Sequence, residues 1–477
     1  MSGAIISGAD VSADVDVRCD VCIVGSGAGG AVLAEGLVAA GLDVVMLETG
    51  GSFSRADFDL HEQNAYPMLY QDRGTRATAD LSISILQGRS VGGSTTINWT
   101  TCFRTPERIL QHWQRVHGIE GLDERSLRPH FEAVESRLSI AQWGEARANA
   151  NNRAILRGAR ELGWAVEATR RNVKGCVDSG YCAVGCPVDG KQAMHVTYLP
   201  DAVASGMRLY ADCEARRVVV EGQRVTTVEA VILDRRTGRP SGRKVTVRPK
   251  VVALSGGAIN TPALLLRSEL NDNGRVGQRT FFHPVVAVAG VHDAVINGFW
   301  GAPQSIASHE HVDRGPDRVG FFMESCPVQP MLIALGTGGF GDKMAAFMAQ
   351  LPHATAMLAL CVDGLLPGDE GGVVSLRRDG RIRVDYPISD GLKEAFAAAH
   401  LALARLTLAS GATQAVTMHT DPLVMSDTGA LGLLDRGLYG AHEHGIFTAH
   451  QMGGCGMGAD PATSVVNAEH RHHAVPN

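Results

Sequence analysis

The chain has 477 residues, of which 44 are Lys or Arg and 50 are Asp or Glu, so its formal charge at pH 7 is −6. Because this charge is mildly negative and the basic residues form no long run, the composition argues against a nucleic-acid-binding protein. Glycine is the one unusual component, with 56 residues. Such an excess is typical of tight turns or of backbone that closely approaches a ligand.

Membrane insertion and secretion are not expected. The sequence contains no run of eighteen apolar residues, which predicts that no transmembrane segment is present. Its start lacks the basic and long apolar segments of a secretory signal. The ten cysteines are too few for a disulfide scaffold, which favours a reducing compartment. We therefore expect a cytoplasmic protein.

The first predicted elements form a β–α–β unit. Residues 20–24 are an apolar, β-branched run typical of a buried strand, and residues 31–40 have the composition of a helix. Residues 42–48 are the second predicted strand, and Glu48 ends it. An acid at this place can accept hydrogen bonds from both hydroxyls of an adenosine ribose.

A glycine-rich turn, GSGAGG, joins the first strand to the helix. Gly25 allows the tight turn, Gly27 lets the backbone approach a pyrophosphate, and Gly30 lets helix and strand pack closely. Because strand, helix and acid accompany the fingerprint, the unit predicts a site for NAD or FAD. Glu48 without a neighbouring Arg disfavours the 2′-phosphate of NADP.

A second glycine cluster, GRSVGGSTTIN, occupies residues 88–98. Its small residues offer backbone N–H groups suited to a phosphate or an electron-rich ring. A third glycine turn at 255–262 follows a strand and opens a short helix, 263–267. Between the two we predict helices at 123–138 and 151–163 and strands at 216–220, 228–233 and 244–254.

The pattern changes from about residue 285 to 435. Val373–Leu376 and Ile382–Asp385, separated by an Asp-Gly turn, predict an antiparallel hairpin, and residues 392–409 predict a long helix. Antiparallel strands with a helix on one face indicate a second domain inserted into the first.

Four segments together resemble the glucose–methanol–choline (GMC) oxidoreductases, in the order of that family. They are the glycine turn with Glu48, residues 88–98, residues 257–268 and the run HQMGGCGMG at 450–458. The resemblance implies an α/β fold, with a doubly wound, Rossmann-like FAD-binding domain and an inserted α+β substrate domain built on an antiparallel sheet. We assign residues 18–284 to the FAD-binding domain, 285–435 to the substrate domain and 436–477 to a truncated return to the FAD-binding domain.

The resemblance also implies roles for single residues. His450 corresponds to the active-site base that accepts the alcohol proton while hydride leaves for flavin N5, a role that suits an imidazole. Non-covalent FAD is expected, because Ile97 stands where some members carry a flavin-linking histidine. The cofactor-binding residues would be Gly25, Gly27 and Gly30 at the pyrophosphate, Glu48 at the ribose, and Gly92, Gly93, Ser94 and Asn98 at the flavin.

The expected activity is oxidation of the CH–OH group of a small-molecule alcohol, by a dehydrogenase rather than an oxidase. A cytochrome, a quinone or oxygen would accept the electrons. The alternatives are an oxygen-dependent alcohol oxidase and a catalytically silent FAD-binding fragment or electron-transfer component. Sugars, sterols, cyclic and long-chain alcohols all remain candidate substrates, although the apolar run 354–362 favours an apolar one. Family members continue past the segment matching 470–477 with a strand, a turn carrying a second active-site His or Asn, and a helix, so we expect a truncated or atypical end.

A cysteine-rich loop at residues 174–192 contains Cys176, Cys182 and Cys186, spaced C-x5-C-x3-C and followed by a proline. It is similar to the loop that carries a 3Fe–4S cluster in bacterial FAD-dependent glucose dehydrogenases, and Cys-Pro often closes iron–sulfur loops. Long-chain alcohol oxidases have related loops without an established cluster. Three interpretations stay open: an iron–sulfur cluster, structural or free cysteines, and zinc, which would need a fourth ligand such as His195.

Overall fold

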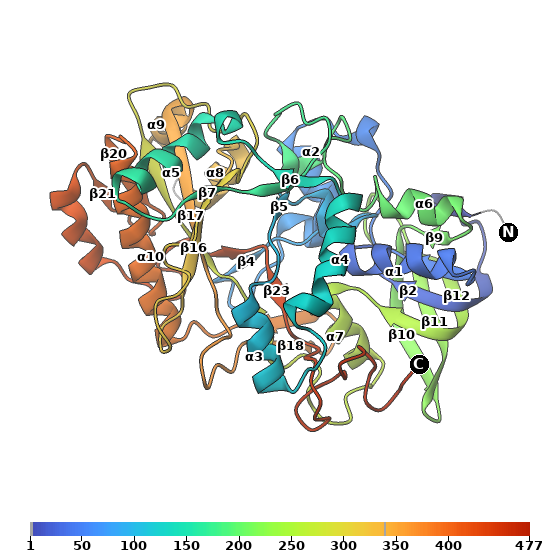
Figure 1. Cartoon of the computed structure of the whole chain (residues 1–477). Coiled ribbons are helices and arrows are strands. Elements are labelled where there is room, and N and C mark those ends of the chain that lie inside the picture. Colours follow the sequence, from blue (N-terminus) through green and yellow to red (C-terminus); the bar gives the residue numbers. More distant parts are fainter. Residues whose placement is uncertain (1–2, 338–339) are drawn as a thin grey trace.

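A seven-stranded sheet organises one side of the computed structural model, which describes residues 3–337 and 340–477 (Figure 1). The first five strands in its spatial order run parallel to one another. Each of the last two pairs antiparallel with the strand before it in that order. The order is β1 (Ala4–Ile6), β9 (Arg208–Tyr210), β3 (Val44–Leu47), β2 (Val15–Val24), β12 (Pro240–Leu254), β11 (Arg224–Leu233) and β10 (Cys213–Glu221).

Helices cover both faces of this sheet. α1 (Ala28–Ala39) and α6 (Tyr198–Ala204) pack on one face, where Ala31 and Leu199 join the apolar side chains of β2 and β3. α7 (Gly257–Arg267) packs on the other face through Leu264. Parallel strands buried from both sides are the doubly wound arrangement expected from the sequence.

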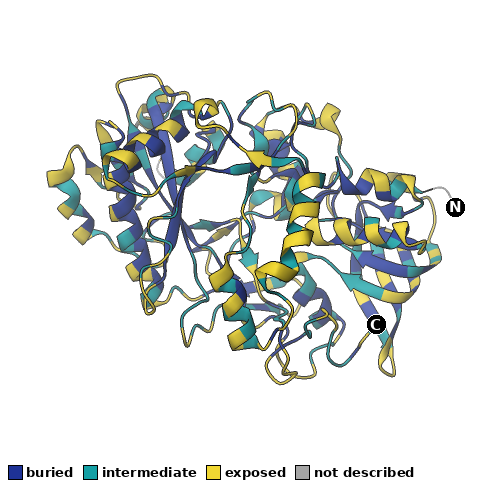
Figure 2. Ribbon diagram, in the orientation of Figure 1, coloured by how far each residue is buried: buried dark blue, intermediate teal, exposed yellow. Residues whose placement is uncertain are grey.

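A second, antiparallel sheet lies on the other side of the molecule (Figure 1). Its central strand β17 is buried along its whole length, as the dark blue arrow in Figure 2 shows. The order is β21 (Val424–Met425), β20 (Gln414–Thr417), β14 (Val285–Val291), β17 (Ala354–Cys361), β16 (Phe321–Ser325), β15 (Ile306–Ser308) and β7 (Glu167–Ala168). The antiparallel substrate sheet predicted from the sequence is thus present.

Two long helices cover one face of the second sheet. α10 (Asp390–Ala409) is capped by Ser389, whose hydroxyl accepts the Leu392 N–H at 3.1 Å, and it buries Phe396 and Leu403 against the sheet. α5 (Ala150–Glu161) packs beside it. The opposite face carries an apolar cluster near α8 (Pro330–Thr337) and α9 (Gly341–Ala349).

Two short strands extend the second sheet: β22 (Phe447–Thr448) pairs with β14, and β4 (Ser84–Ile85) pairs with β22. Three smaller sheets are separate. They are β13 (Phe281–Phe282) with β23 (Gln451–Met452), the hairpin β18 (Val373–Leu376) and β19 (Ile382–Asp385), and β5 (Thr101–Cys102), β8 (Arg170–Asn172) and β6 (Ile140–Gln142). The remaining helices are α2 (Glu62–Leu69), α3 (Glu107–His117) and α4 (Glu124–Arg137). Of the helices that the structure describes, none is long and apolar enough to cross a lipid bilayer.

Candidate active site

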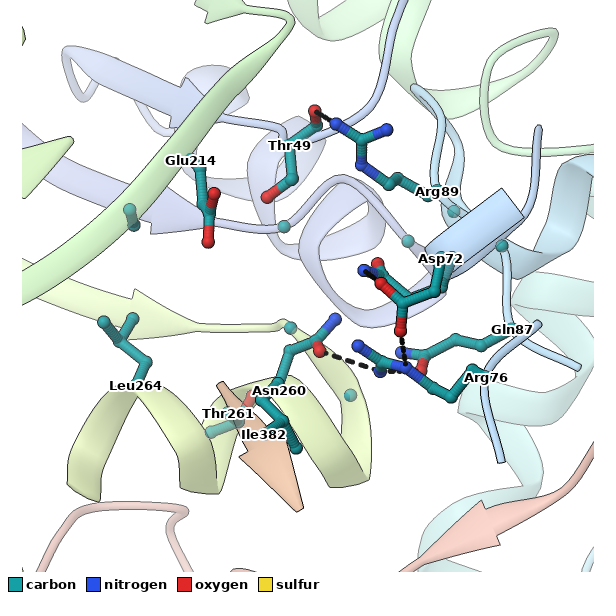
Figure 3. Close-up of a pocket in the computed structure, with 18 of the residues that line it drawn as sticks. Thr49, Asp72, Arg76, Gln87, Arg89, Glu214, Asn260, Thr261, Leu264 and Ile382 are labelled. Carbon is teal, nitrogen blue, oxygen red and sulfur yellow. Dashed lines mark hydrogen bonds and ion pairs between the residues drawn. The ribbon is translucent and has the colours of Figure 1, made fainter. Parts of the chain in front are cut away.

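A cavity of about 1220 Å³ opens at the carboxyl ends of the parallel strands (Figure 3). Because β2, β3 and β12 run in one direction, the turns that follow them meet at the same edge of the sheet. These turns supply residues 24–29, 48–49 and 254–257 of the lining. The second glycine cluster and the β18–β19 hairpin line other sides.

In the glycine turn, one position has no room for a side chain and another has open space beside it. A Cβ on Gly30 would lie 2.1 Å from the Gly25 carbonyl oxygen, so Gly30 is required for the helix to pack on the turn. A Cβ on Gly27 would meet nothing nearer than the Gly93 Cα, at 4.0 Å. Gly27 precedes α1 as its N-cap without a side-chain capping bond, so the first N–H groups of the helix are left for an anion in the cavity.

Glu48 and Ser26 hold the two glycine clusters together. One Glu48 carboxylate oxygen accepts the Ser26 N–H at 3.0 Å and the Ser26 hydroxyl at 2.7 Å, and the other accepts the Gly50 N–H at 2.8 Å. The Ser26 hydroxyl in turn accepts the Gly92 N–H at 3.0 Å. Burial raises the pKa of Glu48. The sequence predicted Glu48 but not Ser26, whose role depends on a contact 66 residues away.

The second glycine cluster approaches the first at backbone distance. Gly92 and Gly93 have φ values of +97° and +58°, and a Cβ on Gly93 would lie 2.8 Å from the Gly27 Cα. The Ser94 hydroxyl accepts the Gly88 N–H at 2.9 Å. Gly93 and Ser94 line the cavity, and Asn98 is exposed four residues further along.

The cavity wall is rich in arginine. Arg76 is buried and donates to Asp72 at 2.9 Å, to Gln87 at 2.7 Å and to Asn260 at 3.0 Å, as drawn in Figure 3. The lining acids are Glu48, Asp72, Glu214 and Asp379, and the lining arginines are Arg73, Arg76, Arg89, Arg216, Arg267, Arg377, Arg381 and Arg383. This excess of positive charge suits a phosphate-bearing ligand.

His450 lies beside a second histidine, His283. The antiparallel ladder of β13 and β23 pairs Phe282 with Gln451, which sets His283 opposite His450. The His283 N–H donates to the His450 carbonyl oxygen at 3.2 Å, and the two Nδ1 atoms are 3.0 Å apart. Burial lowers the pKa of both rings, that of His283 to about 3 with a smaller contribution from His450. Both imidazoles are therefore neutral at pH 7.

The histidine pair remains accessible although protein surrounds it. His450 retains exposed surface and His283 is half-buried. The His283 ring contacts the Phe322 ring edge to face, with the ring centroids 6.2 Å apart. The Phe322 ring stacks on the His309 ring, with the centroids 5.6 Å apart. The Gln451 amide donates to the Leu86 carbonyl at 3.4 Å, one residue before Gln87 in the cavity wall. Gln451 thus joins the pair to the segment that lines the cavity, and neither His283 nor His450 is itself a lining residue.

Family models for GMC oxidoreductases match residues 66–285 and 371–477, which is more than half of the sequence. The chain belongs to the GMC oxidoreductase family. An uncharacterized GMC-type oxidoreductase of Mycobacterium tuberculosis is 32% identical over 404 residues, 84% of this chain and 61% of that protein. A long-chain-alcohol oxidase of Arabidopsis thaliana is 30% identical over 282 residues, 58% of this chain and 37% of that protein. This GMC chain therefore spans less than two thirds of the length of either relative.

Solved structures of similar fold include two oxidases. The pyridoxine 4-oxidase of Mesorbium loti superposes with a TM-score of 0.70 at 19% identity, over 96% of this GMC chain and 92% of that chain. A formate oxidase of Aspergillus oryzae gives a TM-score of 0.67 at 14% identity, over 97% and 93%. At these identities the likeness establishes the fold only.

Cys176, Cys182 and Cys186, the three cysteines of the cysteine-rich loop, line one small cavity together with Lys191. The buried Lys191 ammonium donates to the Cys182 carbonyl at 2.7 Å and to the Asn98 carbonyl at 3.0 Å, so it joins the cysteine loop to the second glycine cluster. Burial raises the pKa of Cys176 to about 11. Within residues 3–337 and 340–477, no group of three or more His, Cys, Asp or Glu side chains is arranged to hold a metal ion.

Proposed function

We propose that this GMC oxidoreductase binds FAD non-covalently and oxidises the CH–OH group of an alcohol, with His450 as the base. The single observation that carries the proposal is the arginine-rich cavity into which the open side of Gly27 and the first turn of α1 face. A dinucleotide diphosphate matches both the charge and the close backbone approach.

The lining residues fit FAD along the length of the cavity. The diphosphate would lie at Gly27 and the N-terminus of α1, and the adenosine ribose at the Glu48 carboxylate. The flavin would extend past Gly93 and Ser94 toward Asn98. Ile97 is buried and has no atom that could form a covalent link to the flavin, which supports non-covalent binding.

Bound flavin supplies a two-electron acceptor for hydride. The residues of the chain handle the proton: neutral His450 accepts it from the alcohol hydroxyl while the carbinol C–H bond gives up its hydride, and the substrate leaves as a carbonyl compound. Because burial lowers the pKa of His450, the ring is present as a base at neutral pH. Its exposed surface gives the substrate access to it.

We infer that the alcohol carries an apolar group. The face of the second sheet turned away from α10 presents an apolar cluster that Trp99 and Phe447 join from neighbouring segments. Phe322, a member of this cluster, contacts His283 edge to face, so the apolar cluster reaches the histidine pair. The buried members are Val285, Ala287, Phe322, Cys326, Val328, Leu351, Ala354, Ala356, Leu358 and Leu360. The name of the Arabidopsis relative, a long-chain-alcohol oxidase, agrees with this class.

The base is tested by His450→Ala in the FAD-loaded protein. We expect FAD content to stay equal to that of the parent, and anaerobic flavin reduction by an aliphatic alcohol to slow roughly 10²–10⁴-fold. Stopped-flow absorbance of the flavin measures this rate. Equal rates within a few-fold would show that His450 is structural. A protein that purifies without flavin and takes up none would contradict the whole proposal.

The dehydrogenase assignment is tested separately. Turnover with an artificial dye and no peroxide in air is the expected result, and peroxide formed at the same rate would instead identify an oxidase. Flavin that binds but is not reduced by any alcohol would support the silent fragment.

The cysteine loop is a second candidate site, for an iron–sulfur cluster that passes electrons out of the flavin. Two observations favour it: the three thiols line one cavity, and buried Lys191 and Arg171 place positive charge beside them, where sulfide and thiolate would add negative charge. The donor set suits a cluster, although the described side chains are not gathered about one ion. Iron and acid-labile sulfide in anaerobically purified protein, lost in Cys182→Ser, are the expected result. Protein that contains no iron would exclude the cluster.

A further inference from the structure

We propose that His283 is a positioning residue that holds His450 in the tautomer needed for proton abstraction. The inference rests on the proposed role of His450 and adds a residue that the sequence motifs did not indicate. Its starting point is the 3.0 Å separation of the two Nδ1 atoms, from residues 167 apart in the chain.

Only one of two neutral arrangements leaves His450 able to act. A neutral imidazole has one N–H and one lone pair, so one Nδ1 must donate to the other. If His283 donates, His450 carries its proton on Nε2 and its lone pair is consumed at Nδ1. If His450 donates, its Nε2 lone pair is free to accept the proton of a substrate.

His283 is suited to the accepting role. Burial and the neighbouring His450 lower the pKa of His283 to about 3, so its ring stays neutral and keeps a lone pair over the working pH range. Once His450 has taken up a proton, its Nδ1–H can still donate to that lone pair, and a charged donor strengthens the bond. The contact therefore orients the free base and stabilises the imidazolium.

The backbone fixes the geometry of the contact. The β13–β23 ladder and the bond from the His283 N–H to the His450 carbonyl oxygen set the two rings side by side. The preceding Phe282 is fixed as well. Its N–H donates to the Tyr386 hydroxyl at 3.1 Å, and its ring stacks on the Tyr386 ring with the centroids 4.3 Å apart. The Tyr386 hydroxyl donates to Asp363.

Few other groups act on the pair. Burial is the one cause that lowers the pKa of His450. The pKa of His283 is lowered by burial and, among the described residues, by the charge of His450 alone. The Thr448 hydroxyl donates to the His450 carbonyl oxygen at 3.0 Å and accepts the His450 N–H at 3.2 Å. Both bonds involve the backbone of His450 and not its ring. The His309 ring stacks on the Phe322 ring, and the His309 Nδ1 lies 3.6 Å from a carboxylate oxygen of Glu167. A change in the titration of His450 on altering His283 can therefore be assigned to their contact.

The first test reads the tautomer without turnover. In ¹⁵N-histidine-labelled, flavin-free protein, the His450 signals are assigned by their absence in His450→Ala. We expect the proton of His450 on Nδ1 in the parent and in His283→Asn, whose amide oxygen can accept in place of the imidazole. In His283→Leu the Nδ1 preference should be lost. A parent His450 protonated on Nε2 would overturn the proposal.

The second test is the pH profile of flavin reduction. Neutral His450 is the active form, so the rate falls below its pKa. Because the lost acceptor had stabilised the imidazolium, His283→Leu should lower that pKa and move the acid limb to lower pH. Its plateau should fall about 10- to 100-fold, by analogy with the loss on removing the hydrogen-bond partner that orients a metal-bound histidine. His283→Asn should restore both features toward the parent.

The outcomes separate the inference from the function on which it rests. An acid limb that does not move in His283→Leu, with FAD content equal to the parent, assigns His283 a packing role and overturns the inference alone. Parent-like flavin reduction in His450→Ala overturns the base itself. If His283→Leu does not fold, the tautomer of the parent and the His283→Asn profile still decide.

Discussion

At the scale of single residues, the sequence could single out Gly25, Gly27, Gly30 and Glu48 because their pattern is local: each depends on neighbours within one β–α–β unit. Their roles toward a cofactor stay predictions. Ser26, Arg76 and His283 escaped prediction for the opposite reason. Their partners Gly92, Asn260 and His450 lie 66, 184 and 167 residues away, and no spacing along the chain indicates such contacts.

Gly27 and Gly30 allow a paired test of the cofactor site. An aspartate at Gly27 has room within the protein, since its Cβ meets nothing nearer than 4.0 Å, but it would place negative charge where a diphosphate must lie. We expect Gly27→Asp to fold with the stability of the flavin-free parent and to bind no FAD. Flavin absorbance after dialysis measures binding, and stoichiometric FAD in the variant would contradict the placement.

Gly30→Ala is the matched control. Its Cβ would lie 2.1 Å from the Gly25 carbonyl oxygen, so the turn itself must shift. This variant should lose stability even without FAD, typically by about 1–3 kcal/mol, the range of overpacking changes. Urea unfolding of the two flavin-free variants distinguishes loss of binding from loss of fold.

At the scale of elements, periodicity located several of the long helices and strands but not α3 (Glu107–His117), and it missed the shortest strands. The β18–β19 hairpin has the predicted bounds, and α10 begins at Asp390, two residues earlier than predicted, because Ser389 caps it. Residues 51–87 showed no pattern, since most of the segment is loop, and yet residues 71–79 line the cavity. Strands of two residues, such as β13 and β23, cannot show alternation at all.

α10 and the segments beside it enclose a histidine cluster, made of His400, His419 and His444. Their ring centroids lie 4.9, 5.2 and 5.5 Å apart, and all three side chains are buried. Burial lowers their pKa values, that of His400 to about 3 and that of His444 to about 4. The folded His400 and His444 are therefore neutral at pH 5, where unfolded histidines bind protons.

The cluster predicts a loss of stability in acid. Below pH 6.5 the unfolded chain takes up protons that the folded His400 and His444 exclude, so the free energy of unfolding decreases as the pH is lowered. At pH 5 the decrease is about 2 kcal/mol for each of these two histidines. His400→Leu should reduce the difference between pH 7 and pH 5 by that amount in urea titrations. Replacing His130, which is exposed on α4, should leave the difference unchanged. Equal pH dependence in the parent and His400→Leu would show that the buried ring does not resist protonation.

At the scale of the whole molecule, the cavity wall comes from distant parts of the sequence, from residue 24 to residue 384. A ligand that contacts all of them binds the folded chain and not the unfolded one. Free FAD at 100 times its dissociation constant should therefore raise the free energy of unfolding by about 2.7 kcal/mol. Thermal unfolding followed over an FAD series measures the effect, and Gly27→Asp should show no shift. An equal shift with riboflavin, which has no diphosphate, would contradict the proposal that the cavity arginines bind the diphosphate.

The ladder between β13 and β23 also has a consequence for the order in which the protein matures. Its two strands are two residues long and lie about 170 positions apart, and little local structure can form them early. During synthesis, His283 leaves the ribosome long before its partner exists. The glycine turns and the parallel strands precede β13 or end before it, so they can form while His450, the proposed base, is still unaligned. We therefore expect the parts of the proposed dinucleotide site and the proposed proton-abstracting pair to become ordered at different stages of synthesis.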